Sequence, residues 1–105
     1  MTAYDRIGGE ERLVELVNVF VERIFLDPII GFLFLGKDKK RIGSREFELA
    51  SMHLGGPHRY GGRPLVATHQ ALRINRGQFR RRLAILKTVL LDHGVPEDII
   101  ESWIS

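Results

Sequence analysis

The sequence predicts an all-α fold, and three observations lead to this prediction. Apolar residues recur at intervals of three and four along most of the chain, which is the period of an amphipathic helix. No segment shows the strict alternation of apolar and polar residues that is typical of a half-buried strand. Glycine and proline gather between the periodic segments, where they favour turns. With 105 residues, of which 44% are hydrophobic, residues 1–105 are expected to form one domain.

The first long helix is expected to begin at Gly8 and Gly9 and to end at Asp27. Pro28 disfavours helical geometry in the residue before it, so the chain must turn there. The predicted buried positions of this helix are Leu13, Leu16, Val17, Phe20 and Ile24. After the proline, residues 29–34 are expected to form a short apolar segment that ends at Phe34.

The next helix is expected to follow the polar break at residues 36–40. Residues at helical spacing share one of its faces: Ile42, Glu46, Leu49, Ala50 and His53. Gly55, Gly56 and Pro57 are predicted to end this helix. Residues 58–64 are rich in glycine and proline and are therefore expected to form an irregular loop.

Residues 65–74 place one histidine among apolar side chains. On a helix, His69 would share a face with Leu65, Val66 and Leu72. The lone-pair nitrogen of a neutral imidazole there must accept a hydrogen bond, bind a metal, or stay unsatisfied at a cost in free energy. The chain has no cysteine, so a metal would be held by histidine or carboxylate. A hydrogen-bonded core histidine and a metal ligand both remain open at this point.

Two further helices complete the predicted fold. Asn75 is expected to cap a long helix, with Gln78 as the second half of a capping box and Gly94 at its end. Its apolar positions are Phe79, Leu83, Leu86 and Leu90. Pro96 begins the last helix. The apolar face of that helix consists of Ile99, Ile100, Trp103 and Ile104.

The formal net charge of +3 comes from a basic excess in the second half of the chain. The residues that contribute most are Arg73, Arg76, Arg80, Arg81, Arg82 and Lys87. They are interpreted either as a surface for phosphates, acidic proteins or cofactor carboxylates, or as a solvated helix face. Arg81 and Arg82 turn away from the others, and no aromatic residues interleave to stack on bases, so we expect no nucleic-acid partner.

The sequence shows no signal for a membrane. No apolar run approaches the roughly 18 to 20 residues that a membrane span needs, and the N-terminus lacks the apolar core of a signal peptide. We therefore expect no membrane partner and a cytoplasmic location. The expected oligomeric state is a monomer or weak homodimer.

Short motifs occur along the chain in a fixed order. They are YDRIGG at residues 4–9, Asp27 and Pro28 followed by Phe34, LGGP at 54–57, YGG at 60–62, His69 and Gln70 through Ile74 with Phe79, and HGVP at 93–96. Together they resemble the truncated haemoglobins, and most of all the first group of that family. The resemblance covers nearly the whole chain and implies a two-on-two helical sandwich around haem b, which is iron protoporphyrin IX.

The resemblance also implies a role for individual residues. His69 would be the proximal ligand of the haem iron, and Phe34 would pack against the porphyrin on the other, distal side, where Phe20 and Val21 also lie. The remaining residues implied to bind the cofactor are Ile42, Arg45, Glu46, Ala50, Leu54, Tyr60, Arg63, Leu65, Leu72, Ile74, Phe79 and Leu83. Arg45, Arg63 and Tyr60 are expected near the haem propionates, and His53 near the pocket rim. His58 and His93 are expected to be surface residues.

The distal side departs from the family pattern at two positions. Oxygen-binding members usually carry a tyrosine donor where this chain has Val21. Because hydrogen bonds to charged or strongly polarised groups contribute about 1.5 to 3 kcal/mol, oxygen is expected to leave roughly tenfold to hundredfold faster without that donor. Glu46 has two alternatives: it faces the haem, where burial would favour its neutral acid, or it pairs with Arg45, Arg41 or another base and leaves an apolar cavity.

The resemblance thus implies a haem protein that reversibly binds small gaseous ligands (O2, CO and NO). NO-detoxifying or peroxidase-like chemistry would be a further activity, and repeated turnover would need an external reductase. The alternative is a globin-fold protein without haem that acts as an interaction or phosphate-binding module through its arginine-rich helix. The last helix is expected to be unusually short for the family, because the sequence stops at Ser105.

Overall fold

The computed structural model describes residues 1–61 and 75–105, and all regular secondary structure in these residues is helical. The helices are α1 (Ala3–Arg6), α2 (Gly9–Leu26), the 3-10 helix η1 (Gly31–Phe34), α3 (Lys39–Leu54), α5 (Arg76–Asp92) and α6 (Glu97–Ile104). The predicted all-α fold is confirmed for this part of the chain. Within the same residues, no helix is both long and apolar enough to cross a bilayer.

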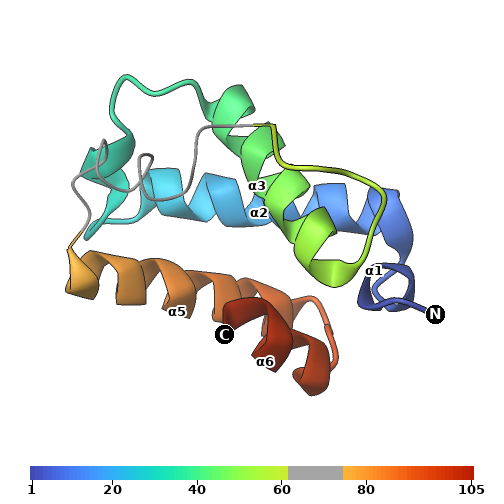
Figure 1. Ribbon diagram of the computed structural model, residues 1–105. Helices are drawn as coiled ribbons and strands as arrows, with labels where there is room; N and C mark the ends of the chain where they lie inside the picture. The colour runs from blue at the N-terminus through green and yellow to red at the C-terminus, as the bar shows by residue number, and fades with distance from the viewer. Residues whose placement is uncertain (62–74) are drawn as a thin grey trace.

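The helices form two layers, with α2 and α3 in one and α5 and α6 in the other (Figure 1). Helix α2 packs against both α3 and α5, and α6 packs against α5 and also reaches α3. The short helix α1 lies at the beginning of α2 and contacts α3 as well. This arrangement confirms the two-on-two sandwich.

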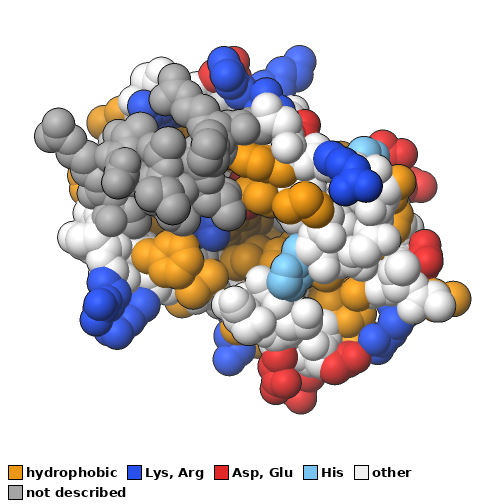
Figure 2. All heavy atoms as spheres, viewed as in Figure 1, with side chains coloured by type: hydrophobic (Ala, Val, Ile, Leu, Met, Phe, Trp, Pro, Cys, Tyr) orange, Lys and Arg blue, Asp and Glu red, His pale blue; other side chains and the backbone are white. Residues whose placement is uncertain are grey.

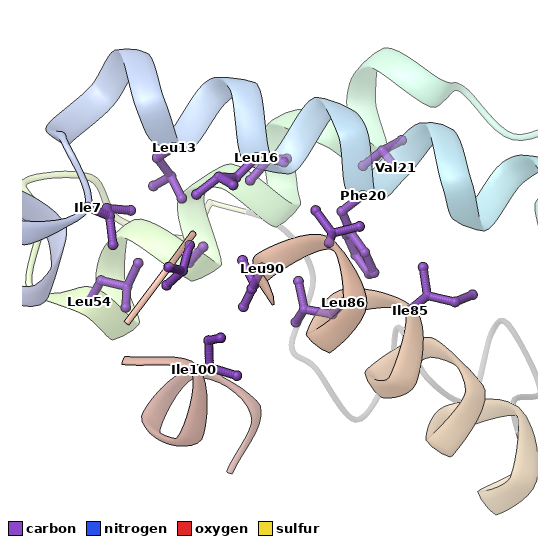
Figure 3. Close-up of a cluster of buried hydrophobic side chains, with 14 of the residues drawn as sticks. Ile7, Leu13, Leu16, Phe20, Val21, Leu54, Ile85, Leu86, Leu90 and Ile100 are labelled. Atoms are coloured by element: carbon purple, nitrogen blue, oxygen red, sulfur yellow. The ribbon is translucent and has the colours of Figure 1, made fainter. Parts of the chain in front are cut away.

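The hydrophobic core lies between the two layers. Figure 3 shows Leu13, Leu16 and Phe20 of α2 pointing toward Leu86 and Leu90 of α5. The exposed fraction of Leu13 and Leu90 is 0%, and that of Phe20 is 2%. Fully burying one such side chain contributes about 1.5 to 3 kcal/mol, so the stripe predicted on α2 supplies much of the stability that holds the layers together.

Helix α2 ends at Leu26, directly before the turn at Asp27 that Pro28 predicts. The Asp27 carboxylate accepts hydrogen bonds from the backbone N–H groups of Ile29 and Ile30, both at 3.0 Å, and these bonds fix the turn after the helix. Gly31 is required next, because a Cβ at this position would lie 2.8 Å from the carbonyl oxygen of Phe25. The turn brings η1 back against α2.

The predicted start of α5 is also confirmed. The Asn75 side chain accepts from the N–H of Gln78 at 2.8 Å, and the Gln78 side chain accepts from the N–H of Asn75 at 2.9 Å. This capping box satisfies two of the N–H groups that a helix start leaves without partners. Helix α3 begins similarly, with the Asp38 carboxylate accepting from the N–H of Arg41 at 3.2 Å.

Helix α1 was not predicted from the sequence. Its four residues are capped by Thr2 and Asp5, whose side chains each accept a hydrogen bond from the other's backbone N–H. Tyr4 is buried, with an exposed fraction of 8%. A single helical turn is too short to show an apolar period, and its sequence therefore carries no sign of a helix of the kind that predicts the longer ones.

Candidate functional site

Phe20, Glu46 and Arg82 meet where α2, α3 and α5 approach one another. The Arg82 guanidinium carbon lies 5.1 Å from the centre of the Phe20 ring. Nη2 of Arg82 donates a hydrogen bond to Oε1 of Glu46. The side chains of Arg82 and Glu46 have exposed fractions of only 20% and 23%. The site therefore contains a partly buried ion pair that rests on an aromatic ring.

In the structure Glu46 pairs with another base, as the second of its two alternatives allows. Glu46 forms an ion pair, but its partner is Arg82 rather than Arg45 or Arg41. Arg82 was expected only to turn away from the basic side of its helix, and no role in the pocket was predicted for it. The apolar spacing of α5 would have shown that Arg82 lies next to Leu83 and Leu86, toward the other layer, but it could not reveal the partner.

The apolar residues predicted to line the haem pocket are distributed between the core and its edge. Ala50 and Leu54 are core residues with exposed fractions of 5% and 3%, whereas Ile42 and Leu83 are half-buried and Phe79 is 37% exposed. Figure 2 shows a hollow between α3 and α5 that is floored by hydrophobic side chains. This arrangement fits a flat apolar group, because a cofactor there would cover side chains that the protein leaves partly open.

Phe34 and Val21 both belong to the hydrophobic core but have different neighbours. Phe34 is 5% exposed and stacks on Phe25, with ring centres 5.1 Å apart and an angle of 26° between the rings. Val21 is 3% exposed and lines a groove of about 730 Å³ between α2 and α3, together with Val17 and Phe47. The pocket roles predicted for Phe34 and Val21 stay predictions.

The residues proposed to hold propionates have partners within the chain. Nη1 of Arg45 donates to both carboxylate oxygens of Glu48, at 3.0 and 3.3 Å. Glu48 also accepts from the N–H of Gly61 at 2.8 Å, and this bond, followed by the one from Arg45, holds the pKa of Glu48 below its ordinary value. Tyr60, beside this contact, is half-buried. The roles of Arg45 and Tyr60 toward a propionate remain predictions.

His58 and His93, which were expected at the surface, are half-buried and have hydrogen-bond partners. His58 is half-buried: its Nδ1 is hydrogen-bonded to Oγ of Ser51 at 2.9 Å, and its ring meets the edge of Phe47 at 4.7 Å. His93 is half-buried at the end of α5, where its Nδ1 donates to the carbonyl of Val89 at 2.8 Å. Loop residues show no apolar period, so their burial had no signal in the sequence.

His53 is exposed and joins two helices. Its Nε2 donates to the carbonyl oxygen of Ser102 at 2.6 Å, which links the end of α3 to α6. This contact gives His53 a structural partner.

Several predicted site residues lie outside the described residues. They are Arg63, Leu65, His69, Leu72 and Ile74. In residues 1–61 and 75–105, no three side chains among His, Cys, Asp and Glu are grouped so as to hold a metal ion. A haem iron needs no such cluster, because the porphyrin supplies most of its ligands and the protein needs to add only one histidine.

Two arginines of the arginine-rich helix α5 form ion pairs with residues of this chain. Arg81 pairs with Asp27, with Nη2 donating to Oδ1 at 2.6 Å, and Arg82 pairs with Glu46. Arg76, Arg80 and Lys87 are exposed. The helix therefore offers a smaller basic surface than its composition suggests, which weakens the alternative of a phosphate-binding module.

Comparisons of the sequence and the structure with known proteins find matches to globins. A family described as bacterial-like globin matches residues 2–105. The group 1 truncated haemoglobin GlbN of Mycolicibacterium paratuberculosis is 34% identical over 97 residues, which cover 92% of this chain and 71% of that protein. The group 1 truncated haemoglobin of Tetrahymena pyriformis is 24% identical over 99 residues, which cover 94% of this chain and 82% of that protein.

Solved structures agree with the sequence relatives. The structure of Chlamydomonas reinhardtii THB1 has a TM-score of 0.82 and 30% identity, and the match covers 98% of this chain and 87% of that one. The Fe(III) form of the Tetrahymena pyriformis truncated haemoglobin has a TM-score of 0.87 and 24% identity, with 96% of this chain and 86% of that one covered.

Proposed function

Because this chain belongs to the bacterial-like globin family, whose members bind haem, we propose that it holds haem b through His69 and reversibly binds the diatomic gases O2, CO and NO. The observation that supports this proposal best is the family match, which extends over residues 2–105 and agrees with the two-on-two fold. The half-buried apolar residues at the hollow between α3 and α5 add to it.

Haem would supply the iron to which a gas molecule binds. The chain's own residues would hold this cofactor and shape the space around the ligand. Ile42 of α3 and Leu83 of α5 offer apolar walls that exclude water, and Phe34, which stacks on Phe25, would pack against the porphyrin. Exclusion of water keeps a bound gas molecule away from competing solvent.

The distal residues favour ligands that need little hydrogen bonding. Phe20 and Val21 have no polar group that could donate a hydrogen bond to a bound gas molecule. O2 depends more on a donor than CO or NO does, because it becomes strongly polarised when it binds. We therefore propose fast O2 release and a role in ligand exchange or NO and peroxide chemistry, with an external reductase for turnover, rather than in oxygen storage.

The experiment that tests this function is reconstitution with hemin, followed by the Soret absorbance. The wild-type chain and a His53→Ala control are expected to give the same Soret band, because among residues 1–61 and 75–105 the hydrogen-bond partner of His53 is Ser102 of α6. His69→Ala is expected to lose that spectrum, since the iron would have no proximal ligand. An unchanged spectrum in His69→Ala would contradict the assignment of the ligand. A wild-type chain that takes up no hemin would favour the module without haem.

A further inference from the structure

The ion pair of Arg82 and Glu46 is a charged feature among apolar neighbours. Nη2 of Arg82 donates to Glu46, and the guanidinium lies over the ring of Phe20. For the other guanidinium nitrogens, Nε and Nη1, the described residues show no acceptor. Arg82 therefore has N–H groups left with which it can bind a further oxygen or nitrogen atom.

The surroundings of the pair strengthen such an interaction. Phe20 is 2% exposed, and the Arg82 side chain is only 20% exposed. Charges interact more strongly in this environment than in water, because less solvent screens them. Glu46 and the ring of Phe20 also hold the guanidinium in one position, which reduces the entropy lost when it binds a ligand.

We propose that Arg82 is a ligand-recognition residue of the haem pocket and that it favours small inorganic anions, of the class of azide, cyanide and nitrite, over uncharged gases. The proposal rests on the proposed function, since the anion would occupy the ligand site of haem held by His69. Arg82 comes from α5 and reaches the pocket from the layer opposite to Glu46.

The two members of the pair act on an anion in opposite directions. Arg82 attracts it and donates hydrogen bonds to it. Glu46 keeps Arg82 in position but carries a negative charge that offsets the positive one. If the pair served only to hold α3 and α5 together, breaking it from either side would change the affinity for all ligands in the same direction.

The experiment compares an anion with an uncharged ligand in hemin-reconstituted protein. Azide affinity is measured by titration of the Soret band of the ferric protein, and CO affinity is measured on the reduced protein. Arg82→Met is expected to weaken azide binding by about tenfold to hundredfold, the effect of losing a charge-assisted hydrogen bond, while CO affinity changes by less than about threefold. Glu46→Gln is expected to strengthen azide binding by about threefold to tenfold, because the offsetting charge is gone.

Two controls belong to the same experiment. Arg80→Met removes an exposed charge from the same helix and is expected to leave both affinities unchanged. Arg82→Lys keeps the charge and is expected to retain most of the azide affinity. Circular dichroism and urea unfolding of each variant without hemin verify that the chain folds.

Three results would overturn the proposal. One is an azide affinity that does not respond to Arg82→Met, and another is an equal loss of azide and CO affinity. The third is a weaker azide affinity in Glu46→Gln. A wild-type chain that takes up no hemin would contradict both the proposed function and this proposal. A normal Soret band together with any of the three results would contradict only this proposal.

Discussion

At the scale of single residues, Asp27 links the end of α2 to α5. Its side chain is only 5% exposed. It accepts hydrogen bonds from Nε of Arg81 at 3.2 Å and from Nη2 at 2.6 Å, besides those from Ile29 and Ile30. The bonds from Arg81 are the main reason why the pKa of Asp27 lies below its ordinary value, and they outweigh burial, which raises it.

The lowered pKa determines how Asp27 contributes to stability at different pH. The folded state prefers the ionised carboxylate, so the stabilisation is complete above the pKa of the unfolded chain, about 3.9. It is lost as the pH falls through the lower pKa of the folded state. Asp27 thus stabilises the fold at neutral pH and ceases to do so in strong acid.

We predict that Asp27→Asn lowers the free energy of unfolding at pH 7 by about 1 to 3 kcal/mol, because Arg81 loses its charged partner. The variant should also lose less stability than the wild type between pH 5 and pH 3, which urea unfolding at both values would measure. Asp92→Asn is the matched control: its pair with Arg23 is exposed, with a distance of 3.4 Å, and the change should stay below about 0.5 kcal/mol. Equal losses in the two variants would refute the prediction.

The partners of Asp27 and Glu46 show which part of the site the sequence could not predict. The end of α2 at Asp27 could be predicted, since Pro28 acts on the neighbouring residue. Arg81 and Arg82 are separated from Asp27 and Glu46 by 54 and 36 residues. Periodicity shows which side of a helix is polar, but a pairing over such separations depends on how α2, α3 and α5 pack.

At the scale of secondary-structure elements, the two glycines after α3 join this helix to α1. Gly55 ends α3 with a φ of 85°, a conformation that other residues rarely adopt. A methyl group on Gly56 would overlap Oγ of Ser51 and lie 2.6 Å from Cδ2 of Tyr4. The absence of a side chain at Gly56 therefore lets Tyr4 of α1 pack against Ser51 of α3.

We predict that Gly56→Ala destabilises the protein by about 1 to 3 kcal/mol, because the added methyl group forces Tyr4 or Ser51 to move. Gly43→Ala is the matched control within α3. A Cβ there would meet nothing within 4 Å, so the better helix propensity of alanine should stabilise the chain by about 0.5 to 1 kcal/mol. Thermal unfolding of the two variants provides the measurement. The same sign of change in both would argue against the close packing at Gly56.

The longer elements were predictable because several signals agreed in each. In helix α5 the capping box at Asn75 and the glycine after its end were confirmed. Of its predicted apolar positions, Leu86 and Leu90 are buried, whereas Phe79 is 37% exposed. The errors fall where such signals are missing. Helix α1 spans less than two turns, and the half-buried His58 lies in a loop after α3 whose contact with Ser51 the sequence does not indicate.

At the scale of the whole molecule, the sequence alone predicted helices, whereas their arrangement in two layers followed from the resemblance to the truncated haemoglobins. The core between α2 and α5 holds the layers together, but the side of the molecule seen in Figure 2 keeps an apolar hollow between α3 and α5. A domain of 105 residues can bury only a modest core. Cofactor binding is therefore expected to contribute strongly to the stability of the whole fold.

We predict that hemin raises the Tm of the wild-type chain by about 10 °C or more. A ligand that binds only the folded state at 100 times its Kd stabilises it by about 2.7 kcal/mol, and each kcal/mol shifts the Tm of a domain of this size by roughly 4 to 8 °C. Circular dichroism during heating, with and without hemin, measures the shift.

The same measurement can separate the iron ligand from the apolar contacts. Protoporphyrin without iron retains the apolar contacts but forms no bond to His69, so it should stabilise the wild-type chain less than hemin does. In His69→Ala, hemin and iron-free protoporphyrin should therefore produce equally small shifts, because both would bind through apolar contacts alone. If hemin raised the Tm of His69→Ala as much as that of the wild type, the stabilisation would come from apolar burial, and His69 would not be the residue that couples the iron to the fold.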